Sequence, residues 1–232
     1  GEEQPNTNSK LKNPKNLRLT KFFLKDVNLV LLSPMLESDF EDIKTYKTVY
    51  YLPNGVENDY DKKSFEDYIS RKDFTKINVL YLSNMIKSKG YFEVLRLAKL
   101  YKELDIHFNF AGAWQNKEDE NNFFNFIKNN HLEKVVTFHG FVNGNEKKKL
   151  YENAQILLFP TRYKAESFGL VIIEAFSYGV PVLATNEGSI PYIIDEKSGI
   201  CIDDLSKLSD SFKEMQEKYL NLETAKYCRN RY

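Results

Sequence analysis

Short apolar segments alternate with helix-length amphipathic segments along most of this 232-residue chain. The apolar segments are rich in Val, Ile and Leu, and they are INVLYLS, IHFNFAG, VVTFHG, QILLFP, PVLAT and GICI. Between them lie GYFEVLRLAKLYKEL, KEDENNFFNFIKNNHL, NEKKKLYENA and FGLVIIEAFSYG, and DLSKLSDSFKEMQEKYL predicts a helix after the last strand. Such alternation is typical of right-handed βαβ units. It predicts an α/β fold with a buried parallel sheet.

The first third of the chain has a different pattern. Residues 1–17 are rich in Asn, Lys and Pro, which predicts an extended segment, and LRLTKFFLKD predicts a short basic amphipathic helix. The stretches VNLVLLSP, SDFEDIKTY and TVYYLPNGV then predict strand, helix and strand, with Pro53-Asn54-Gly55 as a turn. A polar connection from about Glu57 to Lys76 follows. We therefore expect two domains, over residues 1–75 and 76–232.

Composition excludes several classes of protein. The formal net charge is zero, which argues against nucleic-acid binding because such binding relies on many Lys and Arg contacts to phosphates. The apolar runs are far shorter than the roughly 20 residues that span a bilayer. Cys201 and Cys228 fit neither a disulfide framework nor a metal-ligand spacing, so we expect a protein of the reducing cytosol. Because the chain starts without Met and stops inside an expected helix, we also expect a fragment of a longer protein.

In parallel α/β sheets, ligands bind beyond the carboxyl ends of the strands, where loops lead into helix N-termini. The stretch YLSNMIKSKGYFEV places Lys87 and Lys89 in such a loop, and Gly90 begins the next helix. An anion here would meet a Lys ammonium, free backbone N–H groups and the positive end of the helix dipole. The alternative is a solvated Lys-rich turn, which a Lys-Gly pair by itself favours.

A second segment of this kind is FPTRYKAESFGLVIIEAFSYGVPVLAT. Its loop carries Glu166, and its helix starts near Phe168-Gly169 and contains Glu174. If the span were helical throughout, the two carboxylates would lie roughly 12 Å apart, at about 1.5 Å per residue. Carboxylates accept hydrogen bonds and a helix N-terminus holds anions, so the pair suits a nucleotide sugar. The alternative makes Glu166 an N-cap acid and Glu174 a solvated helix residue.

The stretch ESFGLVIIEAFSYGVPVLAT resembles the E-x7-E signature of the GT4 family of retaining glycosyltransferases, which have the GT-B fold. FPTRYKAESFG, FHGFVNGNEKKKLYENA and YLSNMIKSKG fall in that family's order and spacing, and the resemblance covers about Val27 to the C-terminus. It implies a Rossmann-like C-terminal domain with a parallel sheet that binds the donor. A remnant of the N-terminal, acceptor domain would precede it.

The resemblance implies a role for each matching residue. Glu166 would bind the donor sugar's hydroxyls beside the anomeric centre, Glu174 the ribose hydroxyls, and Lys89 the departing diphosphate. Catalysis would rest on stabilising that charge and an oxocarbenium-like sugar, without a covalent nucleophile. Two further sets would line the donor: the backbone of Ser167, Phe168, Gly169 and Leu170 at the sugar and diphosphate, and Val142 and Lys147 near the base.

This sequence departs from the family pattern in two ways. Ser83-Asn84 stands where the family usually has Gly-Arg, so Asn84 would supply a hydrogen bond but no charge at the diphosphate. Either Lys87 substitutes, or turnover is slower, or the donor differs. The family's acceptor domain, with its Gly-rich loop and catalytic histidine, would lie upstream of Gly1.

Other polar residues fit a site less well. Asp59-Tyr60-Asp61 matches the D-x-D by which another class of glycosyltransferases binds a metal, but its place in a polar connector predicts a solvated loop. The histidines are scattered without metal-ligand partners, so we expect packed or surface roles for His107, His131 and His139, with a place near the base as the alternative for His139. Trp114 is expected to pack against its own loop.

Two functions remain open at this stage. The chain is either the donor-binding part of a retaining hexosyltransferase of glycan biosynthesis, using UDP- or GDP-hexose without a cofactor or metal, or a noncatalytic nucleotide-sugar- or partner-binding module of the same fold. The enzyme would act on a glycan or lipid-linked acceptor. The basic helix with Phe22, Phe23 and Leu24 predicts packing onto its own domain or, as the alternative, peripheral contact with the inner face of an anionic membrane.

Overall fold

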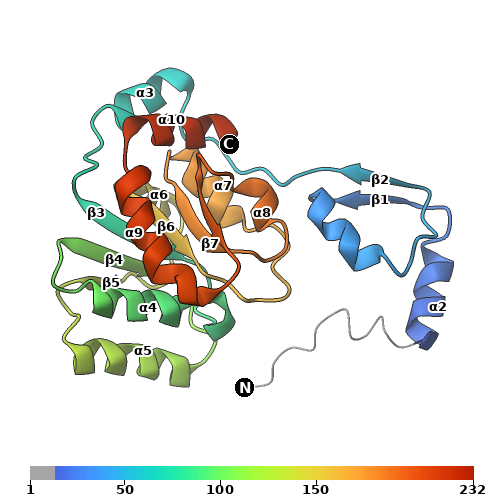
Figure 1. Cartoon of the computed structure of the whole chain (residues 1–232), viewed down its shortest axis with the longest axis horizontal. Coiled ribbons are helices and arrows are strands. Elements are labelled where there is room, and N and C mark those ends of the chain that lie inside the picture. The colour runs from blue at the N-terminus through green and yellow to red at the C-terminus, as the bar shows by residue number, and fades with distance from the viewer. Residues whose placement is uncertain (1–13) are drawn as a thin grey trace.

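Six short strands form the parallel sheet that the sequence predicts. The computed structural model describes residues 14–232, and its main sheet has the order β5-β4-β3-β6-β7-β8 with every neighbouring pair parallel (Figure 1). The strands are β3 (Ile77–Leu82), β4 (Ile106–Ala111), β5 (Val136–Phe138), β6 (Ile156–Phe159), β7 (Val182–Thr185) and β8 (Gly199–Ile202). The direction of winding reverses between β3 and β6, and α/β sheets bind ligands at such a switch point.

Helices cover both faces of this sheet (Figure 1). Val79 and Tyr81 of β3 belong to one core, with α4, α5 and α9, whereas Leu80 belongs to a second core, with α6, α7, α8 and α10. This division follows from the two-residue period of a strand. The helices are α4 (Tyr91–Leu100), α5 (Lys117–Asn130), α6 (Gly144–Asn153), α7 (Leu170–Ser177), α8 (Ile190–Ile193), α9 (Leu208–Lys218) and α10 (Leu222–Arg231), with short 3₁₀ turns η2 (Lys87–Lys89) and η3 (Leu205–Lys207).

The N-terminal part contains helix α2 (Pro14–Phe23), strands β1 (Asn28–Leu31) and β2 (Thr48–Tyr51), and the 3₁₀ helix η1 (Pro34–Phe40) between them. Both predicted strands are confirmed, and they pair in parallel. The α-helix expected over SDFEDIKTY is wrong, because the helical turn starts earlier, at Pro34, whose fixed φ suits the first helical position. Of the segment expected to be extended, residues 14–17 are helical and belong to α2, and residues 1–13 lie outside the described residues.

Helix α2 confirms the short helix that LRLTKFFLKD predicts. The helix contacts its own domain through the Thr45 hydroxyl, which donates to the Lys21 carbonyl at 3.0 Å, although none of its residues is fully buried. Leu19, Phe22 and Phe23 are exposed on it. Within residues 14–232, no helix is both long and apolar enough to cross a bilayer.

The connector between the two parts differs from its prediction in two respects. Pro53-Asn54-Gly55 forms no turn, and the chain continues without helix or strand to Asp61, consistent with the extended bias that a proline places on the preceding residue. The second half of the connector is helix α3 (Lys62–Ile69), which Asp61 caps by accepting a hydrogen bond from Ser64 N at 2.8 Å. Helix α3 packs Phe65 and Ile69 against α10, so it belongs spatially to the C-terminal domain.

Side chains fasten the end of the connector to the C-terminal domain. Arg229 of α10 donates to the Tyr60 carbonyl, the Tyr60 hydroxyl donates to Glu152 of α6, and the Tyr178 hydroxyl donates to Asp59. Asp59 and Asp61 are exposed, as the solvated-loop reading of the D-x-D expects, but each also takes a structural hydrogen bond. Nearer the N-terminus, Ser33 Oγ lies 2.6 Å from Ser189 Oγ in a buried contact.

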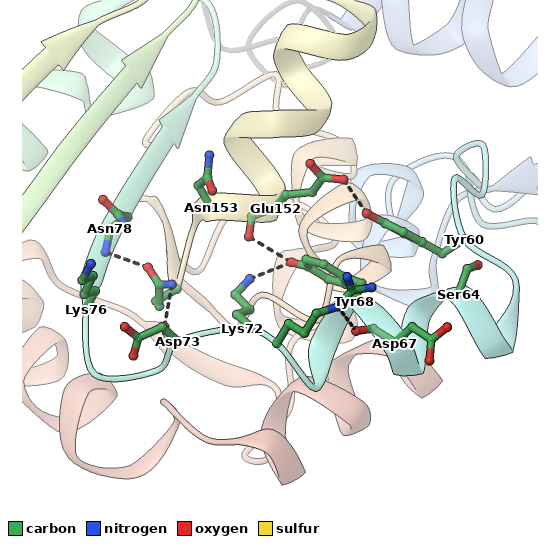
Figure 2. A pocket seen from close by; sticks show the side chains of 12 residues that line it. Tyr60, Ser64, Asp67, Tyr68, Lys72, Asp73, Lys76, Asn78, Glu152 and Asn153 are labelled. Carbon is green, nitrogen blue, oxygen red and sulfur yellow. Dashed lines mark hydrogen bonds between the residues drawn. The ribbon is translucent and has the colours of Figure 1, made fainter.

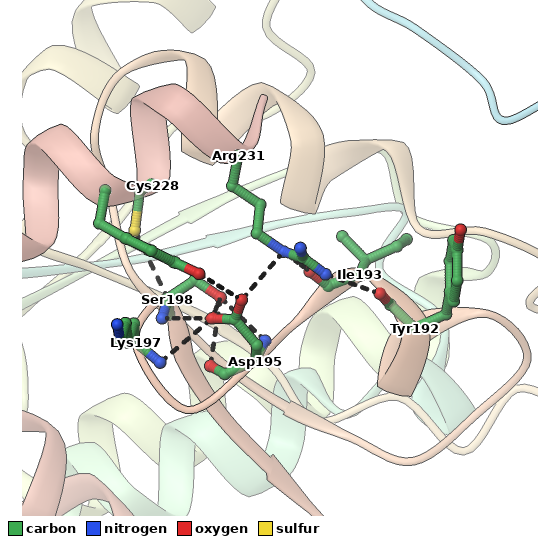
Figure 3. A network of polar contacts seen from close by, with 8 residues as sticks. Tyr192, Ile193, Asp195, Lys197, Ser198, Cys228 and Arg231 are labelled. Atoms are coloured by element: carbon green, nitrogen blue, oxygen red, sulfur yellow. Dashed lines mark hydrogen bonds and ion pairs between the residues drawn. The ribbon is translucent and has the colours of Figure 1, made fainter.

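Asp195 holds helix α10 against the loop between α8 and β8 (Figure 3). Its carboxylate accepts from the Tyr227 hydroxyl at 2.7 Å and from the Ser198 amide and hydroxyl at 3.0 and 2.9 Å, and Arg231 Nε lies 3.4 Å away. Burial by itself would raise the pKa of Asp195. The hydrogen bonds from Tyr227 and Ser198 outweigh burial, so the pKa lies below its usual value.

We predict that Asp195→Asn lowers the free energy of unfolding at pH 7 by about 1–3 kcal/mol, because charge-assisted hydrogen bonds are lost. A carboxyl whose pKa is depressed by folding stabilises the protein above its unfolded pKa of about 3.9 and loses that effect as pH falls through the folded pKa. The difference between wild type and variant, measured by urea unfolding, should therefore shrink below about pH 4. A difference that stays constant down to pH 2.5 would contradict this origin.

Candidate functional site

The two loops singled out in the sequence lie side by side. One follows β3 and the other follows β6, and these strands pair directly in the sheet. The loops are also bonded to each other, because Arg162 N donates to the Ser88 carbonyl at 2.6 Å. The residues predicted to be catalytic meet here: Lys89 Nζ lies 2.8 Å from Glu166 Oε2, with side chains only 17% and 10% exposed.

Two glycines permit this close approach. Gly90 has φ +85°, and a Cβ there would lie 2.2 Å from the Pro160 carbonyl oxygen. Gly188 has φ +55°, and its Cβ would lie 2.0 Å from the Glu166 carbonyl oxygen. Any side chain at either position would force backbone apart. The glycines therefore set where Lys89 and Glu166 can lie, and Gly90 also begins helix α4, so free N–H groups face the same region.

Two side chains of helix α6 hold the carboxylate of Glu174. Lys147 Nζ lies 2.6 Å from its Oε1, and the Tyr151 hydroxyl donates to its Oε2 at 2.7 Å. Tyr151 is fully enclosed, and burial, followed by the nearby Glu174 charge, raises its pKa well above the usual value. The phenol is therefore a permanent donor at neutral pH.

The sequence interpretation missed Tyr151. The available signal was its spacing from Lys147, since residues four apart on a helix share a face. The solvated reading of Glu174 does not hold, because both of its carboxylate oxygens have partners.

The remaining predicted residues divide between backbone and side-chain positions. Helix α7 starts at Leu170, so Glu166 lies in the loop before it, and the helical spacing of 12 Å does not apply. Gly169 precedes the helix with φ +76°, Ser167 accepts at its carbonyl from Ser189 N, and the Phe168 ring is buried in the second core. Only backbone atoms of Phe168 are therefore free to face a ligand.

The residues expected near the diphosphate and the base lie in the loops after β3 and β5 and in α6. Asn84 directly follows Ser83 after β3, and its carbonyl accepts from Ile86 N at 2.7 Å. Val142 lies buried between β5 and α6, two residues before the start of α6, the helix that carries Lys147. Lys87, the residue considered as a substitute cation, lies in η2 with Lys89.

The histidines are engaged in separate contacts in the part of the chain that the structure describes. His107 pairs with Thr137 and His139 with Asn109, and burial lowers the pKa of each imidazole below its usual value. His131 ends α5 in the left-handed conformation. Among residues 14–232, no cluster of three His, Cys, Asp or Glu side chains could hold a metal ion. Trp114 packs into the first core against Phe123 and Phe138, rather than only against its own loop.

These features define a class of protein: a Rossmann-like α/β domain with a polar site beyond the carboxyl ends of its central strands, built from two Lys–Glu pairs and a helix N-terminus. Residues 63–231 match the family model described as glycosyl transferases group 1. The chain belongs to this family. The α/β fold with its parallel six-stranded sheet also matches structures of GT-B glycosyltransferases.

Individual relatives agree with this assignment. A 41.2 kDa protein encoded in the cps region of Klebsiella pneumoniae is 33% identical over 58% of this chain and 34% of its own length. The D-inositol 3-phosphate glycosyltransferase of Arthrobacter sp. is 29% identical over 55% of this chain and 31% of its own length. The pneumococcal O-GlcNAc transferase GtfA, solved with UDP and GlcNAc, superposes with a TM-score of 0.70 at 15% identity, over 88% of this chain and 41% of that one. The chain thus spans about a third of the length of each of these two curated relatives.

We predict that Lys89 and Glu166 stabilise each other. In a double-mutant cycle with Lys89→Met and Glu166→Gln, the coupling free energy should be roughly 0.5–3 kcal/mol, because both partners are largely shielded from water. Urea unfolding of the four proteins measures it. The control is Lys164 and Glu187, which lie at the same 2.8 Å but with Lys164 66% exposed, where coupling should stay below about 1 kcal/mol. Equal coupling in both pairs would contradict the role of burial.

Proposed function

We propose that this chain is the donor-binding part of a retaining hexosyltransferase that uses UDP- or GDP-hexose. The observation that carries the proposal is the pairing of Lys89 with Glu166 beside the N-terminus of α4, with Glu174 of α7 paired to Lys147 of α6. A cation and free N–H groups suit a diphosphate, and a carboxylate on each side suits hydroxyl groups. Support comes from the family and from a transferase of the same fold that is bound to UDP and GlcNAc.

In this proposal the Lys89–Glu166 pair binds the donor without first separating. A carboxylate has about four lone-pair sites, so Glu166 can keep Lys89 and still accept a sugar hydroxyl. As the bond between sugar and diphosphate breaks, negative charge grows on the diphosphate, and Lys89 shifts its interaction toward it. The acceptor hydroxyl would then attack from the face that the nucleotide leaves, which retains the anomeric configuration without a covalent nucleophile.

We further propose that Glu174 binds the ribose hydroxyls while Lys147 and Val142 lie near the base, and that the backbone of Ser167, Phe168, Gly169 and Leu170 lines the sugar and diphosphate. Asn84 would donate a hydrogen bond to the diphosphate. No metal is needed in this scheme, because Lys89 and the helix N-terminus supply the positive charge.

The acceptor is proposed to be a glycan or a lipid-linked glycan of the cytoplasmic side of a membrane. The exposed Leu19, Phe22 and Phe23 on the basic helix α2 support peripheral contact with an anionic bilayer.

The second candidate is a noncatalytic nucleotide-sugar-binding module. It is favoured by Asn84, which leaves Lys89 as the principal cation at the proposed diphosphate position. The two candidates differ in turnover: in the whole protein, the enzyme would release UDP from its donor, and Lys89→Ala would slow that release, whereas a binding module would release none.

We predict that the two glutamates divide the donor between them. Glu174→Ala should lower the affinities for UDP and UDP-sugar alike. Glu166→Ala should lower the affinity for UDP-sugar and leave that for UDP unchanged. Each lost charge-assisted hydrogen bond corresponds to about 1.5–3 kcal/mol, or roughly ten- to hundredfold in affinity. Calorimetric titration measures this, and chelation with EDTA should leave each affinity unchanged. If neither nucleotide binds, or both variants lose both ligands equally, the proposed function or its division of labour fails.

We predict a smaller effect for the tyrosine behind Glu174. Tyr151→Phe removes the donor that fixes the carboxylate, so UDP affinity should fall about three- to tenfold, or roughly 0.7–1.4 kcal/mol, while pyrophosphate affinity stays unchanged. Tyr178→Phe is the matched control, because its ring stacks on Tyr151 but its hydroxyl bonds Asp59. A parallel loss of UDP and pyrophosphate in Tyr151→Phe would indicate a general packing defect instead of a positioned ribose contact.

A further inference from the structure

Two serine hydroxyls join the N-terminal part of the chain to the C-terminal domain. Ser33 Oγ lies 2.6 Å from Ser189 Oγ, and both residues are completely buried. Ser33 follows strand β1, and Ser189 lies in the loop between β7 and α8. The contact therefore connects the carboxyl end of a strand in the small sheet with the carboxyl end of a strand in the large one.

Both serines occupy N-cap positions, Ser33 before η1 and Ser189 before α8. A serine at such a position commonly accepts a hydrogen bond from a backbone N–H of its own helix. Neither side chain makes this bond here, and each hydroxyl has the other as its partner instead. Because a buried hydroxyl without a partner is costly, each serine depends on the other.

The loop that carries Ser189 also supports the backbone around Glu166. Gly188 packs against the Glu166 carbonyl so closely that a Cβ would lie 2.0 Å from its oxygen. The next residue, Ser189, donates its backbone N–H to the Ser167 carbonyl at 3.1 Å. Two consecutive residues of this loop therefore fix the segment from which the Glu166 side chain extends.

The Ser33 contact is a second point of attachment for the N-terminal part. The first is the connector, which has neither helix nor strand over residues 52–61 and is anchored where the Tyr60 hydroxyl donates to Glu152 (Figure 2). A single attachment through such a segment would permit the N-terminal part to rotate. Leu32 packs against the second core beside Ser33, and the hydroxyl pair adds a directional bond to this apolar contact. Together they fix the orientation in which β1 and β2 point toward the C-terminal domain (Figure 1).

We propose that Ser33 is a positioning residue for Glu166. Its hydroxyl holds Ser189, and Ser189 with Gly188 holds the backbone of residues 166 and 167. The inference rests on the function proposed above, in which Glu166 binds the donor sugar. The Glu166 end of the site thus depends on the N-terminal part of the chain, whereas the Glu174 end is held within the C-terminal domain by α6.

The first test is calorimetric titration of the whole chain with UDP and UDP-glucose, and in parallel with GDP and GDP-mannose. Ser33→Ala should lower the affinity for the nucleotide sugar about three- to tenfold, the effect of one hydrogen bond, and leave the affinity for the free nucleotide unchanged. Ser38→Ala is the matched control, because Ser38 is exposed in η1 and its hydroxyl bonds only the nearby Met35 carbonyl. It should leave both affinities unchanged.

A double variant separates a shared contact from two independent defects. Ser33→Ala combined with Ser189→Ala should bind the nucleotide sugar no more weakly than either single variant, because each substitution already breaks the same contact. If the two losses add, or if the free nucleotide loses affinity equally, the positioning role is wrong.

A second measurement needs no nucleotide. Hydrogen exchange of the Ser189 amide, followed by NMR, should be at least about threefold faster in Ser33→Ala than in wild type and unchanged in Ser38→Ala, because the loop has lost a contact that protects it. The same spectra verify that the variants fold. Unchanged exchange at Ser189 would overturn the proposal.

The titrations also distinguish failure of this inference from failure of the proposed function. If wild type binds none of the four ligands, the proposed function fails, and the positioning role fails with it. If wild type binds a nucleotide sugar and Ser33→Ala binds it equally well, only the positioning role fails.

Discussion

The candidate site depends on how closely two loops approach each other at the switch point of the sheet. Because β3 and β6 are direct neighbours, their following loops share one edge, and the absence of a side chain at Gly90 lets the backbone before α4 contact the Pro160 carbonyl. That contact brings Lys89 to Glu166. The absence of a side chain at Gly188 likewise lets its backbone contact the Glu166 carbonyl. Close packing of the backbone therefore sets the positions from which the Lys89 and Glu166 side chains meet.

Each glutamate of the site is paired with a lysine before any ligand arrives. A partly buried carboxylate without a partner would be costly to desolvate, and pairing offsets this cost. It also holds Lys89 at 2.8 Å from Glu166. Glu174 has two partners, because Lys147 and Tyr151 both come from one face of α6. The two ends of the site thus differ in the number of side chains that hold the carboxylate.

A row of tyrosine rings connects the Glu174 end of the site to the rest of the domain. Tyr151 stacks on Tyr178 at 5.3 Å, Tyr178 meets the edge of Tyr60 at 5.9 Å, and Tyr60 stacks on Tyr68 at 5.1 Å. The row begins at Glu174, passes the end of the connector and ends at Tyr68, whose hydroxyl accepts from Lys72 Nζ at 2.9 Å. Their hydroxyls bond Glu174, Asp59 and Glu152, so the same rings anchor the connector to the C-terminal domain.

Periodicity and turn chemistry determine much of this protein from its sequence. The strand and helix alternation from Ile77 onward predicts the parallel sheet, and the glycine and charge positions after two strands predict where Lys89, Glu166 and Glu174 gather. Local sequence patterns mispredict segments whose structure depends on contacts with distant residues. Helix α3 forms in a polar connector because Phe65 and Ile69 pack on α10. Pro53-Asn54-Gly55 forms no turn, although its composition suits one. The spacing of Tyr151 from Lys147 indicates a shared helix face, but only the packed fold brings that face to Glu174. A sequence specifies which groups are present and their local spacing, but only the packed fold decides which of them lose water and meet.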